Sequence, residues 1–384
     1  MSAEGNCVGL FAGIGGIELG LEAAGFETTL LCEVEPAAQA VLRKRMPSVE
    51  LHDDVTTLES LPEDCAVLAA GFPCQDLSQA GRGAGIGGSR SGLVDHIFRL
   101  LDDATTPPRW LVLENVPFML QLDRGEAMRR LAKELGDRGF RWAYRIVDAR
   151  SFGVPQRRRR VLLVASATED PRPVLFGQDE PQPEVPDHHG RACGFYWTEG
   201  NTGLGWVVDG VPTIKGGSGL GIPSPPAIWM PDGRIVTPDI RDAERLQGFE
   251  SDWTLPSTDA GHRGGARWKL VGNAVCVPMA EWLGERLMAS APASEWGPSA
   301  ELAGDHRWPT AAWGEADRAF EVPVGEWPLQ PTRRSLMDFL EFDIHPLSDR
   351  AVRGFRSRLA ASSLRHPPEF MSALDGAVSV SDLP

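Results

Sequence analysis

A cysteine and a glutamate follow two apolar segments and could carry chemistry together. Cys74 lies in the string GFPCQ, residues 71–75, directly after Pro73. Proline restricts its own φ and the conformation of its neighbour, which helps to hold the thiol in a defined orientation. Glu114 begins the string ENV and could point its carboxyl group into the same crevice. A lone cysteine is more often a small core residue, so that alternative stays open at this point.

A glycine-rich turn near the N-terminus could bind an adenosine-containing ligand. The string FAGIGG, residues 11–16, connects an apolar run to a helical pattern, and its glycines let a ligand approach the backbone. Glu18 stands where the dinucleotide pattern has its third glycine, which argues against NAD and FAD. Glu33 could accept hydrogen bonds from ribose hydroxyls, and Asp54 could accept one from an adenine amine. A tight turn with two solvated acids is the alternative.

The segments around these residues alternate between two patterns. Short apolar runs, which predict strands, are each followed by a glycine turn or a stretch with helical spacing. This alternation predicts an α/β fold with a doubly wound, mostly parallel sheet that is covered on both faces. In such a sheet, ligands bind outside the carboxyl ends of the strands, where the candidate residues lie. The predicted strands fall within 6–12, 29–35, 65–72, 109–116 and 159–165.

Composition and charge limit the class of protein. The chain has 384 residues, of which 42% are hydrophobic, as in globular proteins. It has no apolar run of roughly 18 residues and no basic leader with an apolar stretch, so we expect a cytoplasmic protein without membrane contact. Its six cysteines include no CxxC pair and no zinc-like spacing, so we expect neither disulfides nor a metal site. The net charge of −15 weighs against nucleic acid, but residues 141–160 hold seven arginines and one aspartate.

Short strings along residues 7 to 288 appear in the order typical of one family. Together they closely resemble the C5-cytosine DNA methyltransferases, whose cofactor is S-adenosyl-L-methionine. Each string alone could arise by chance, but the ordered set is specific. The strings are FAGIGG at 11, CEVE at 32, DDV at 53, GFPCQDLS at 71, RSGL at 90, ENV at 114, GVPQRRRR at 153, RDAERLQGF at 241 and VGNAV at 271.

The resemblance implies a covalent mechanism on a cytosine that has flipped out of duplex DNA. Cys74 would add as a thiolate to carbon 6. Glu114 would hydrogen-bond ring nitrogen 3 and the exocyclic amine, and Arg158 would contact the carbonyl oxygen and Cys74. Arg160 is the fourth catalytic candidate. The glycine-rich stretch at 79–93 would close over DNA as a mobile loop, with a disordered loop as the alternative.

The resemblance also implies a set of cofactor-binding residues at the strand ends. Val34 departs from the family pattern, because an aromatic residue commonly stacks on adenine at this position. The departure bears only on the affinity for the cofactor. VGNAV would return to the cofactor site from far along the chain. The implied set is Phe11, Gly13, Ile14, Gly15, Glu33, Val34, Asp54, Val55, Gly71, Pro73, Leu93, Asn273 and Ala274.

The implied domain order is discontinuous. Residues 1–168 would form the first part of the catalytic domain, 169–232 a small irregular or β-rich target-recognition domain, 233–290 a return to the catalytic domain, and 300–384 a C-terminal extension. Thr213 and Ile214 resemble a pair common in recognition domains, although ordinary strand residues fit almost as well.

The C-terminal extension carries none of the family strings but has two helical patterns, at 333–342 and 348–364. In the second, Val352, Phe355 and Leu359 make one apolar face, which predicts packing against the catalytic domain. DNA binding beside the target and docking of a defence partner are alternatives.

Two other functions compete with this prediction. A related branch of the family methylates transfer RNA, but the target length and the absence of that branch's Cys-Phe-Thr string favour duplex DNA. A catalytically silent DNA-binding regulator would not need Cys74, Glu114 and Arg158 together. We therefore expect a monomeric enzyme in restriction-modification or phage defence, with a restriction or defence-system protein as a further partner.

Overall fold

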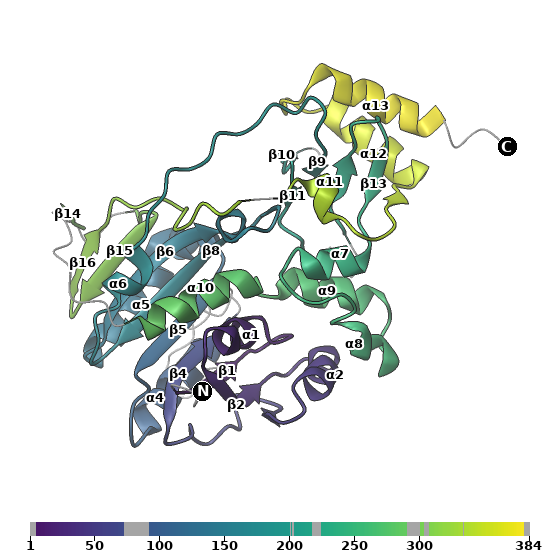
Figure 1. Cartoon of the computed structure of the whole chain (residues 1–384). Coiled ribbons are helices and arrows are strands. Elements are labelled where there is room, and N and C mark those ends of the chain that lie inside the picture. The colour runs from purple at the N-terminus through teal and green to yellow at the C-terminus, as the bar shows by residue number, and fades with distance from the viewer. Residues whose placement is uncertain are drawn as a thin grey trace. The chain divides into compact units, whose positions relative to one another are not determined.

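The computed structural model describes residues 5–72, 92–199, 201, 203–216, 224–289, 300–302, 307–332 and 334–379 (Figure 1). The chain divides into two compact units, each built from separate segments. Unit 1 contains Met1–Phe152, Arg159–Gln182 and Val275–Gln330. Unit 2 contains Gly153–Arg158, Pro183–Ala274 and Pro331–Pro384.

Unit 1 is organised around a ten-stranded sheet with the order β14-β16-β15-β6-β8-β5-β4-β1-β2-β3. The five strands from β5 to β3 run parallel, as the alternating pattern predicts, while β8 pairs antiparallel with both β5 and β6. The α/β fold class is thereby confirmed. The bounds are β1 (Asn6–Leu10), β2 (Glu27–Cys32), β3 (Glu50–His52), β4 (Cys65–Ala70), β5 (Trp110–Asn115), β6 (Arg141–Asp148), β8 (Arg159–Ser166), β14 (Ala300–Glu301), β15 (Ala311–Glu315) and β16 (Arg318–Glu321).

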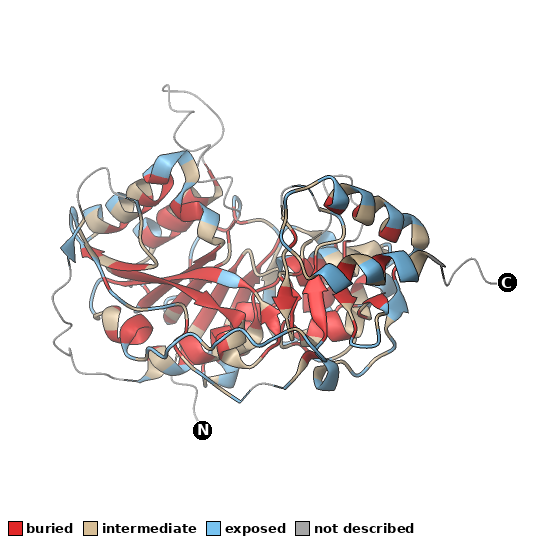
Figure 2. Cartoon of the chain, turned by 90° about the horizontal axis from the view of Figure 1, so that it is seen from above, coloured by how far each residue is buried: buried red, intermediate tan, exposed pale blue. Residues whose placement is uncertain are grey.

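Helices pack on the central strands, which are almost completely buried (Figure 2). The contact between α1 and α10 is close, because a Cβ on Gly20 would lie 2.5 Å from the Ala280 Cβ, and one on Gly284 would lie 2.6 Å from the Ala24 Cβ. Small residues at this crossing therefore let α10, which follows residue 274, pack closely on α1. The helices are α1 (Gly16–Ala23), α2 (Pro36–Arg45), α4 (Leu93–Asp103), α5 (Glu126–Asp137), α6 (Arg172–Phe176) and α10 (Val277–Met288), with 3-10 turns η1 (Pro117–Leu120), η2 (Leu122–Gly125) and η3 (Ala149–Phe152).

Unit 2 contains a five-stranded antiparallel sheet with the order β10-β9-β12-β13-β17 and a separate pair, β11-β7. Its strands are β7 (Gln156–Arg157), β9 (Cys193–Phe195), β10 (Val207–Val208), β11 (Val211–Pro212), β12 (Ala227–Trp229), β13 (Ile235–Thr237) and β17 (His345–Pro346). Its helices are α7 (Ile240–Arg245), α8 (Leu255–Asp259), α9 (Gly265–Asn273), α11 (Leu336–Phe339), α12 (Asp349–Ala360) and α13 (Pro368–Ser379).

The last two helices complete a hydrophobic core in unit 2. The predicted apolar face of α12 is confirmed, since Val352, Phe355 and Leu359 are all buried. The Phe195 ring of β9 lies with its centroid 5.0 Å from the Phe355 ring and 4.9 Å from the Phe370 ring. The packing partner of this face is therefore the sheet of unit 2, and not the catalytic domain as the sequence suggested. The small sheet of unit 2 cannot bury enough apolar surface by itself, and α12 and α13 cover its apolar face.

The compact units divide the chain differently from the segments expected from the sequence. Residues 233–274 group with 183–232, whereas the sequence suggested a return to the catalytic domain at 233. The extension is split, because β15 pairs with the edge of β6 in unit 1 while α12 and α13 belong to unit 2. Backbone hydrogen bonds at a sheet edge place few demands on the side chains, so no sequence pattern marks this pairing.

Among the described residues, no helix is both long enough and apolar enough to cross a membrane.

Candidate active site

Cys74 and Pro73 lie outside the described residues, but the segment leading to them is fixed by the ENV string. The Asn115 side chain donates from Nδ2 to the Phe72 carbonyl oxygen at 2.9 Å. Its Oδ1 accepts a hydrogen bond from the Val116 backbone nitrogen at 2.9 Å. Asn115 therefore ties the end of β5 to the residue that precedes the Pro-Cys pair. Asn115 was not among the candidates predicted from the sequence, although its place between Glu114 and Val116 was a usable signal.

Glu114 forms a buried ion pair at the end of β5. Its Oε1 lies 2.7 Å from Nε of Arg160 on the neighbouring strand β8, and both side chains are about one-tenth exposed. A Cβ on Gly71 would lie 3.6 Å from the other carboxylate oxygen, Oε2. The pair thus lies beside the segment that leads into Cys74. A buried ion pair gives up hydration that its mutual attraction only partly repays, so its presence here is not explained by stability alone.

Arg158 was the first candidate for contact with the cytosine and Cys74, and that contact stays a prediction because Cys74 lies outside the described residues. Its guanidinium is fully buried in unit 2 and donates to backbone carbonyl oxygens of Ala274 at 2.6 Å, Gly272 at 3.1 Å and Ile214 at 3.3 Å. These bonds tie Arg158, between β7 and β8, to Ile214 and to the end of α9. Arg160, two residues on, is the arginine that meets Glu114.

Gln156 is a buried residue of the same string that the sequence argument passed over. Its Nε2 donates to the Leu246 carbonyl oxygen at 2.9 Å, and its Oε1 accepts from the Ile214 nitrogen at 3.0 Å. Thr213 also binds this strand, through its Oγ1 and the Arg157 carbonyl oxygen at 2.8 Å. Ile214 is buried, and the Thr213 hydroxyl is bonded to the Arg157 carbonyl. Both residues are therefore held by contacts within the protein.

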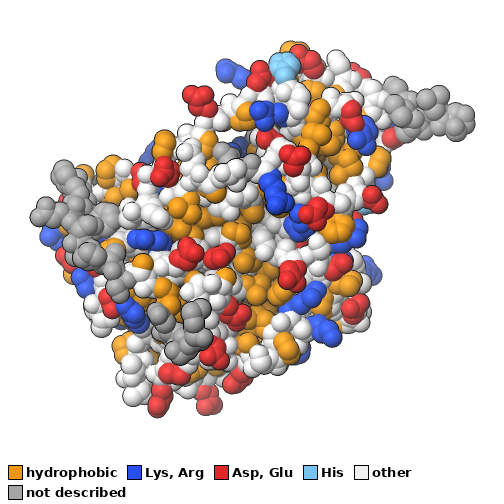
Figure 3. All heavy atoms as spheres, in the orientation of Figure 1, with side chains coloured by type: hydrophobic (Ala, Val, Ile, Leu, Met, Phe, Trp, Pro, Cys, Tyr) orange, Lys and Arg blue, Asp and Glu red, His pale blue; other side chains and the backbone are white. Residues whose placement is uncertain are grey.

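The basic segment at 141–160 is largely paired within the protein. The buried Arg145 pairs with the partly exposed Asp179, and Arg150 lies 2.7 Å from Asp148. Arg159 pairs with Glu326. On the face drawn in Figure 3, acidic and basic side chains are interspersed. The segment is therefore not the open basic surface that its composition suggested.

The glycine turn after β1 has the open geometry that a cofactor requires. Gly13 and Gly15 adopt φ values of 58° and 86°, and Phe11 adopts 55°, a conformation uncommon for a residue with a side chain. A Cβ on Gly13 would meet nothing within 4 Å. The backbone is therefore accessible at that point, while the Ile14 side chain is buried and could offer only its main chain.

Glu33 holds this turn in place. Its Oε2 accepts a hydrogen bond from the Gly13 nitrogen and its Oε1 accepts one from the Glu35 nitrogen, both at 2.7 Å. The carboxyl group is mostly buried, and burial raises its pKa above the usual value. Each carboxylate oxygen can accept a second hydrogen bond, so Glu33 can support the turn and still bind ribose.

Glu18, which replaces the third glycine, does not line the open side of the turn. Its side chain is buried against β1, where a Cβ on Gly9 would lie 2.0 Å from Glu18 Oε1. Burial raises the pKa of this carboxyl group to about 8. The glutamate thus occupies the space that Gly9 leaves in the strand.

Most of the remaining unit 1 candidates follow the ends of neighbouring strands. Val34 follows β2 and is 66% exposed, which suits a flat ligand surface. Asp54 follows β3, where its Oδ1 accepts from the Thr56 nitrogen at 2.9 Å, and this bond lowers the pKa of Asp54. Val55 is buried, Gly71 follows β4, and Leu93 begins α4. Val34, Asp54 and Gly71 therefore lie at one edge of the parallel strands.

Asn273 and Ala274 end the middle segment of unit 2, whereas the other described cofactor candidates belong to unit 1. Their contact with the cofactor therefore stays a prediction. Ala274 is one of the carbonyl partners of Arg158. The next residue, Val275, belongs to unit 1, and its Cγ2 would lie 4.0 Å from a Cβ on Gly71.

A possible cation-binding group lies elsewhere, in unit 2. Asp187, His188 and His189 have ligand atoms within 4.8 Å of one another. His189 and Asp187 already bond to each other at 2.6 Å, and both are about 70% exposed. Neither residue is part of the edge described above.

Comparison with known proteins identifies the likeness in both sequence and fold. Residues 5–191 match the model of the C-5 cytosine-specific DNA methylases. The Type II methyltransferase M2.BsuMI of Bacillus subtilis (strain 168) is 49% identical over 383 residues, which cover 96% of this chain and 97% of that protein. M.NlaX of Neisseria lactamica, another Type II methyltransferase, is 28% identical, covering 74% of this chain and 96% of its own length. The crystal structure of S. pombe Dnmt2 methyltransferase has a TM-score of 0.55 at 16% identity and covers 74% of this chain, a likeness of fold alone.

Proposed function

The chain belongs to the C-5 cytosine-specific DNA methylases, and from this membership we propose that Cys74 attacks the target cytosine while Glu114 and Arg160 hold its ring. The enzyme is a DNA (cytosine-5-)-methyltransferase whose methyl donor is S-adenosyl-L-methionine. The buried Glu114–Arg160 pair beside Gly71 is the observation that supports the roles of Glu114 and Arg160.

The proposed chemistry makes an unreactive carbon nucleophilic. The Cys74 thiolate forms a bond to carbon 6 of cytosine, and the ring electrons shift so that carbon 5 can take the methyl group. The Glu114 carboxyl group supports protonation of ring nitrogen 3, which eases the addition. Loss of the carbon 5 proton then expels the thiolate and restores the double bond. S-adenosyl-L-methionine supplies the electrophilic methyl group when it is bound.

We assign contact with the cytosine carbonyl oxygen to Arg160. The guanidinium of Arg160 is paired with the Glu114 carboxylate, whereas Arg158 donates to three backbone carbonyls of unit 2. A fixed positive charge near Cys74 would also favour the thiolate over the thiol.

The carboxyl edge of β1, β2 and β3 fits the methyl donor. Glu33 offers its oxygens to the ribose, Asp54 its carboxylate to the adenine amine, and Val34 an exposed apolar surface to the adenine ring. The open backbone at Gly13 leaves room for the rest of the ligand. Val34 is smaller than an aromatic ring, so we propose a weaker stacking contact here.

Glu33→Ala should weaken S-adenosyl-L-methionine binding more than Asp54→Ala does. The first variant loses a ribose contact and the support of Gly13, whereas the second loses one contact to the adenine amine at an exposed turn. We expect losses of about 1 to 3 kcal/mol, with Asp54 at the lower end. Calorimetric titration would measure them. Asp53→Ala is the matched control, because Asp53 pairs with Arg43 on the surface and should leave the affinity unchanged. Unchanged affinity in both folded variants would remove Glu33 and Asp54 from the cofactor site.

We extend the role in restriction-modification to this chain from relatives named Type II methyltransferases. The substrate would be duplex DNA with one short target site. The enzyme would act as a monomer in the cytoplasm beside a restriction enzyme of the same specificity, and a phage-defence system is the alternative. Target recognition would lie in 169–232, which falls mostly within unit 2.

Wild-type protein should transfer a tritiated methyl group to duplex DNA and not to transfer RNA. The measurement is acid-precipitable radioactivity on each nucleic acid, followed by sequencing of the methylated positions. Methylation of transfer RNA alone would mean that the substrate is RNA and not duplex DNA. Binding of DNA without transfer to either would favour a silent regulator.

A further inference from the structure

A half-buried arginine on the C-terminal helix α12 is bonded to the middle of the predicted recognition region. Arg358 donates from Nε to the Glu199 carbonyl oxygen at 2.7 Å and from Nη2 to the Trp197 carbonyl oxygen at 2.8 Å. The planar guanidinium fixes both carbonyls in one geometry, which a lysine cannot reproduce. A segment without any methyltransferase string therefore sets the backbone at 197–199.

The same backbone carries a glutamate that faces a lysine from a later part of the recognition region. Glu199 forms an ion pair with Lys215, and their side chains are 29% and 40% exposed. The Lys215 Nζ also lies 3.9 Å from the centre of the Tyr196 ring. Tyr196 in turn donates from its hydroxyl to the Thr213 carbonyl oxygen at 3.0 Å. Lys215 is therefore held by an anion, a ring and a fixed backbone.

Stability does not account for this arrangement. Partly exposed ion pairs add little to folding, because water screens them and two long side chains lose freedom. The arrangement does preorganise a donor beside an acceptor, and preorganised side chains lose less entropy when they bind. In the major groove, a G·C pair presents acceptors on guanine and an amine donor on cytosine. A lysine beside a glutamate matches that edge, since the lysine donates to guanine and the glutamate accepts from cytosine.

We propose that Lys215 and Glu199 read one G·C pair of the target site, and that Arg358 positions them from α12. This inference rests on the proposed recognition role of the region that contains Glu199 and Lys215. It makes the C-terminal extension part of target selection, through backbone contacts and without touching DNA itself.

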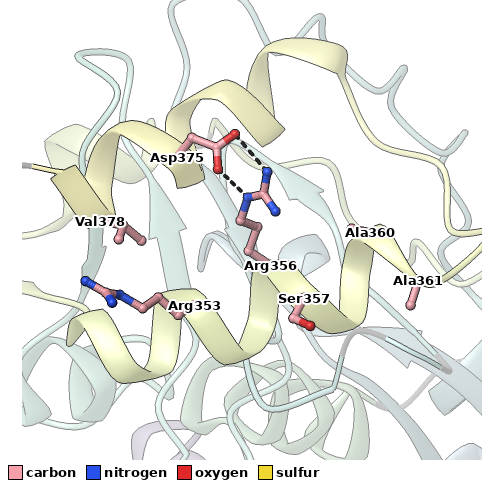
Figure 4. A pocket seen from close by; sticks show the side chains of 7 residues that line it. All are labelled: Arg353, Arg356, Ser357, Ala360, Ala361, Asp375 and Val378. Carbon is pink, nitrogen blue, oxygen red and sulfur yellow. Dashed lines mark hydrogen bonds and ion pairs between the residues drawn. The ribbon is translucent and has the colours of Figure 1, made fainter.

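The other side of α12 provides a control. Arg356 pairs with Asp375 of α13, with Nη2 at 3.1 Å from Oδ2, and both line a groove of about 730 Å³ (Figure 4). Arg356 therefore resembles Arg358 in type, helix and pairing, but its partner lies on α13 and not in the recognition region.

The test first maps the methylated sites of the wild type, and then measures methylation of duplexes in which each G·C pair outside the target cytosine is exchanged in turn. At one position, Lys215→Met, Glu199→Gln and Arg358→Ala should each lose discrimination by about tenfold or more, the scale of one mismatched base pair. Discrimination elsewhere and affinity for S-adenosyl-L-methionine should not change. Arg358→Lys should lose less than Arg358→Ala, and Arg356→Ala should behave as wild type.

Each other outcome overturns a defined part of the inference. A uniform loss across all duplexes in Lys215→Met would mean a phosphate contact and not base reading. Normal discrimination in folded Arg358→Ala, with loss in Lys215→Met, would remove the positioning role of Arg358. Normal discrimination in Lys215→Met, a surface variant that should fold, would overturn the inference while wild-type methylation of duplex DNA upholds the proposed function. No methylation of duplex DNA by the wild type would overturn the proposed function itself.

Discussion

Duplex DNA with 5-fluorocytosine at the target position should stay bound to the wild-type protein through denaturing electrophoresis when S-adenosyl-L-methionine is present. Fluorine cannot leave carbon 5 as a cation, so the thiolate is not expelled and the adduct persists. Cys74→Ser should give no such complex, because a hydroxyl is far less ionised than a thiol. Its methylation rate on normal DNA should fall by at least about a thousandfold.

Another cysteine of the strand leading to Cys74 serves as the control. Cys65 is buried in β4, and burial raises the pKa of its thiol to about 12, so it is not a thiolate at neutral pH. Cys65→Ser should still form the adduct. Glu114→Gln should form it slowly, and omission of S-adenosyl-L-methionine should reduce it, because addition without methyl transfer is reversible. A persistent complex in Cys74→Ser, or none in an active wild type, would rule out Cys74 as the attacking group.

Arg160→Gln and Arg158→Gln should separate catalysis from stability. We expect Arg160→Gln to lower the single-turnover methylation rate by about 10² to 10³, the usual cost of losing one donor aimed at developing charge. Arg158→Gln leaves up to three buried carbonyls without their donor and should lower the free energy of unfolding by about 3 kcal/mol. Its rate per folded molecule should stay within about tenfold of wild type.

The two measurements have to be made on the same samples. Arg160→Gln also leaves the buried Glu114 carboxylate without its partner, so rates are normalised to the folded fraction from circular dichroism. If folded Arg158→Gln loses methyl transfer while keeping full stability, the catalytic role returns to Arg158. If Arg160→Gln transfers methyl groups at the wild-type rate, the Glu114–Arg160 pair is structural.

The sequence alone determined the parts of this protein that depend on local pattern. Alternating strands and helices predicted the parallel sheet, and the strand ends then predicted which residues meet. Gly13, Glu33, Asp54 and Gly71 do lie at one edge, because the carboxyl ends of parallel strands share an edge. The apolar face of α12 was also predictable, since helical spacing alone puts Val352, Phe355 and Leu359 together. The assignment of Cys74 still rests on the sequence.

Only the tertiary structure decided which partner each buried polar group takes. Arg158 and Arg160 are the same residue type two positions apart, yet Arg158 meets three backbone carbonyls and Arg160 meets Glu114. The folded chain brings different distant segments to each of them. Arginines that suggested a basic surface are paired with distant acids such as Asp179 and Glu326. The extension is split between the two units. Its strand β15 forms backbone hydrogen bonds along the edge of β6, while its helix α12 covers the apolar face of the unit 2 sheet. Hydrogen-bond partners and uncovered apolar faces arise only when the chain has folded, so residue spacing does not specify them.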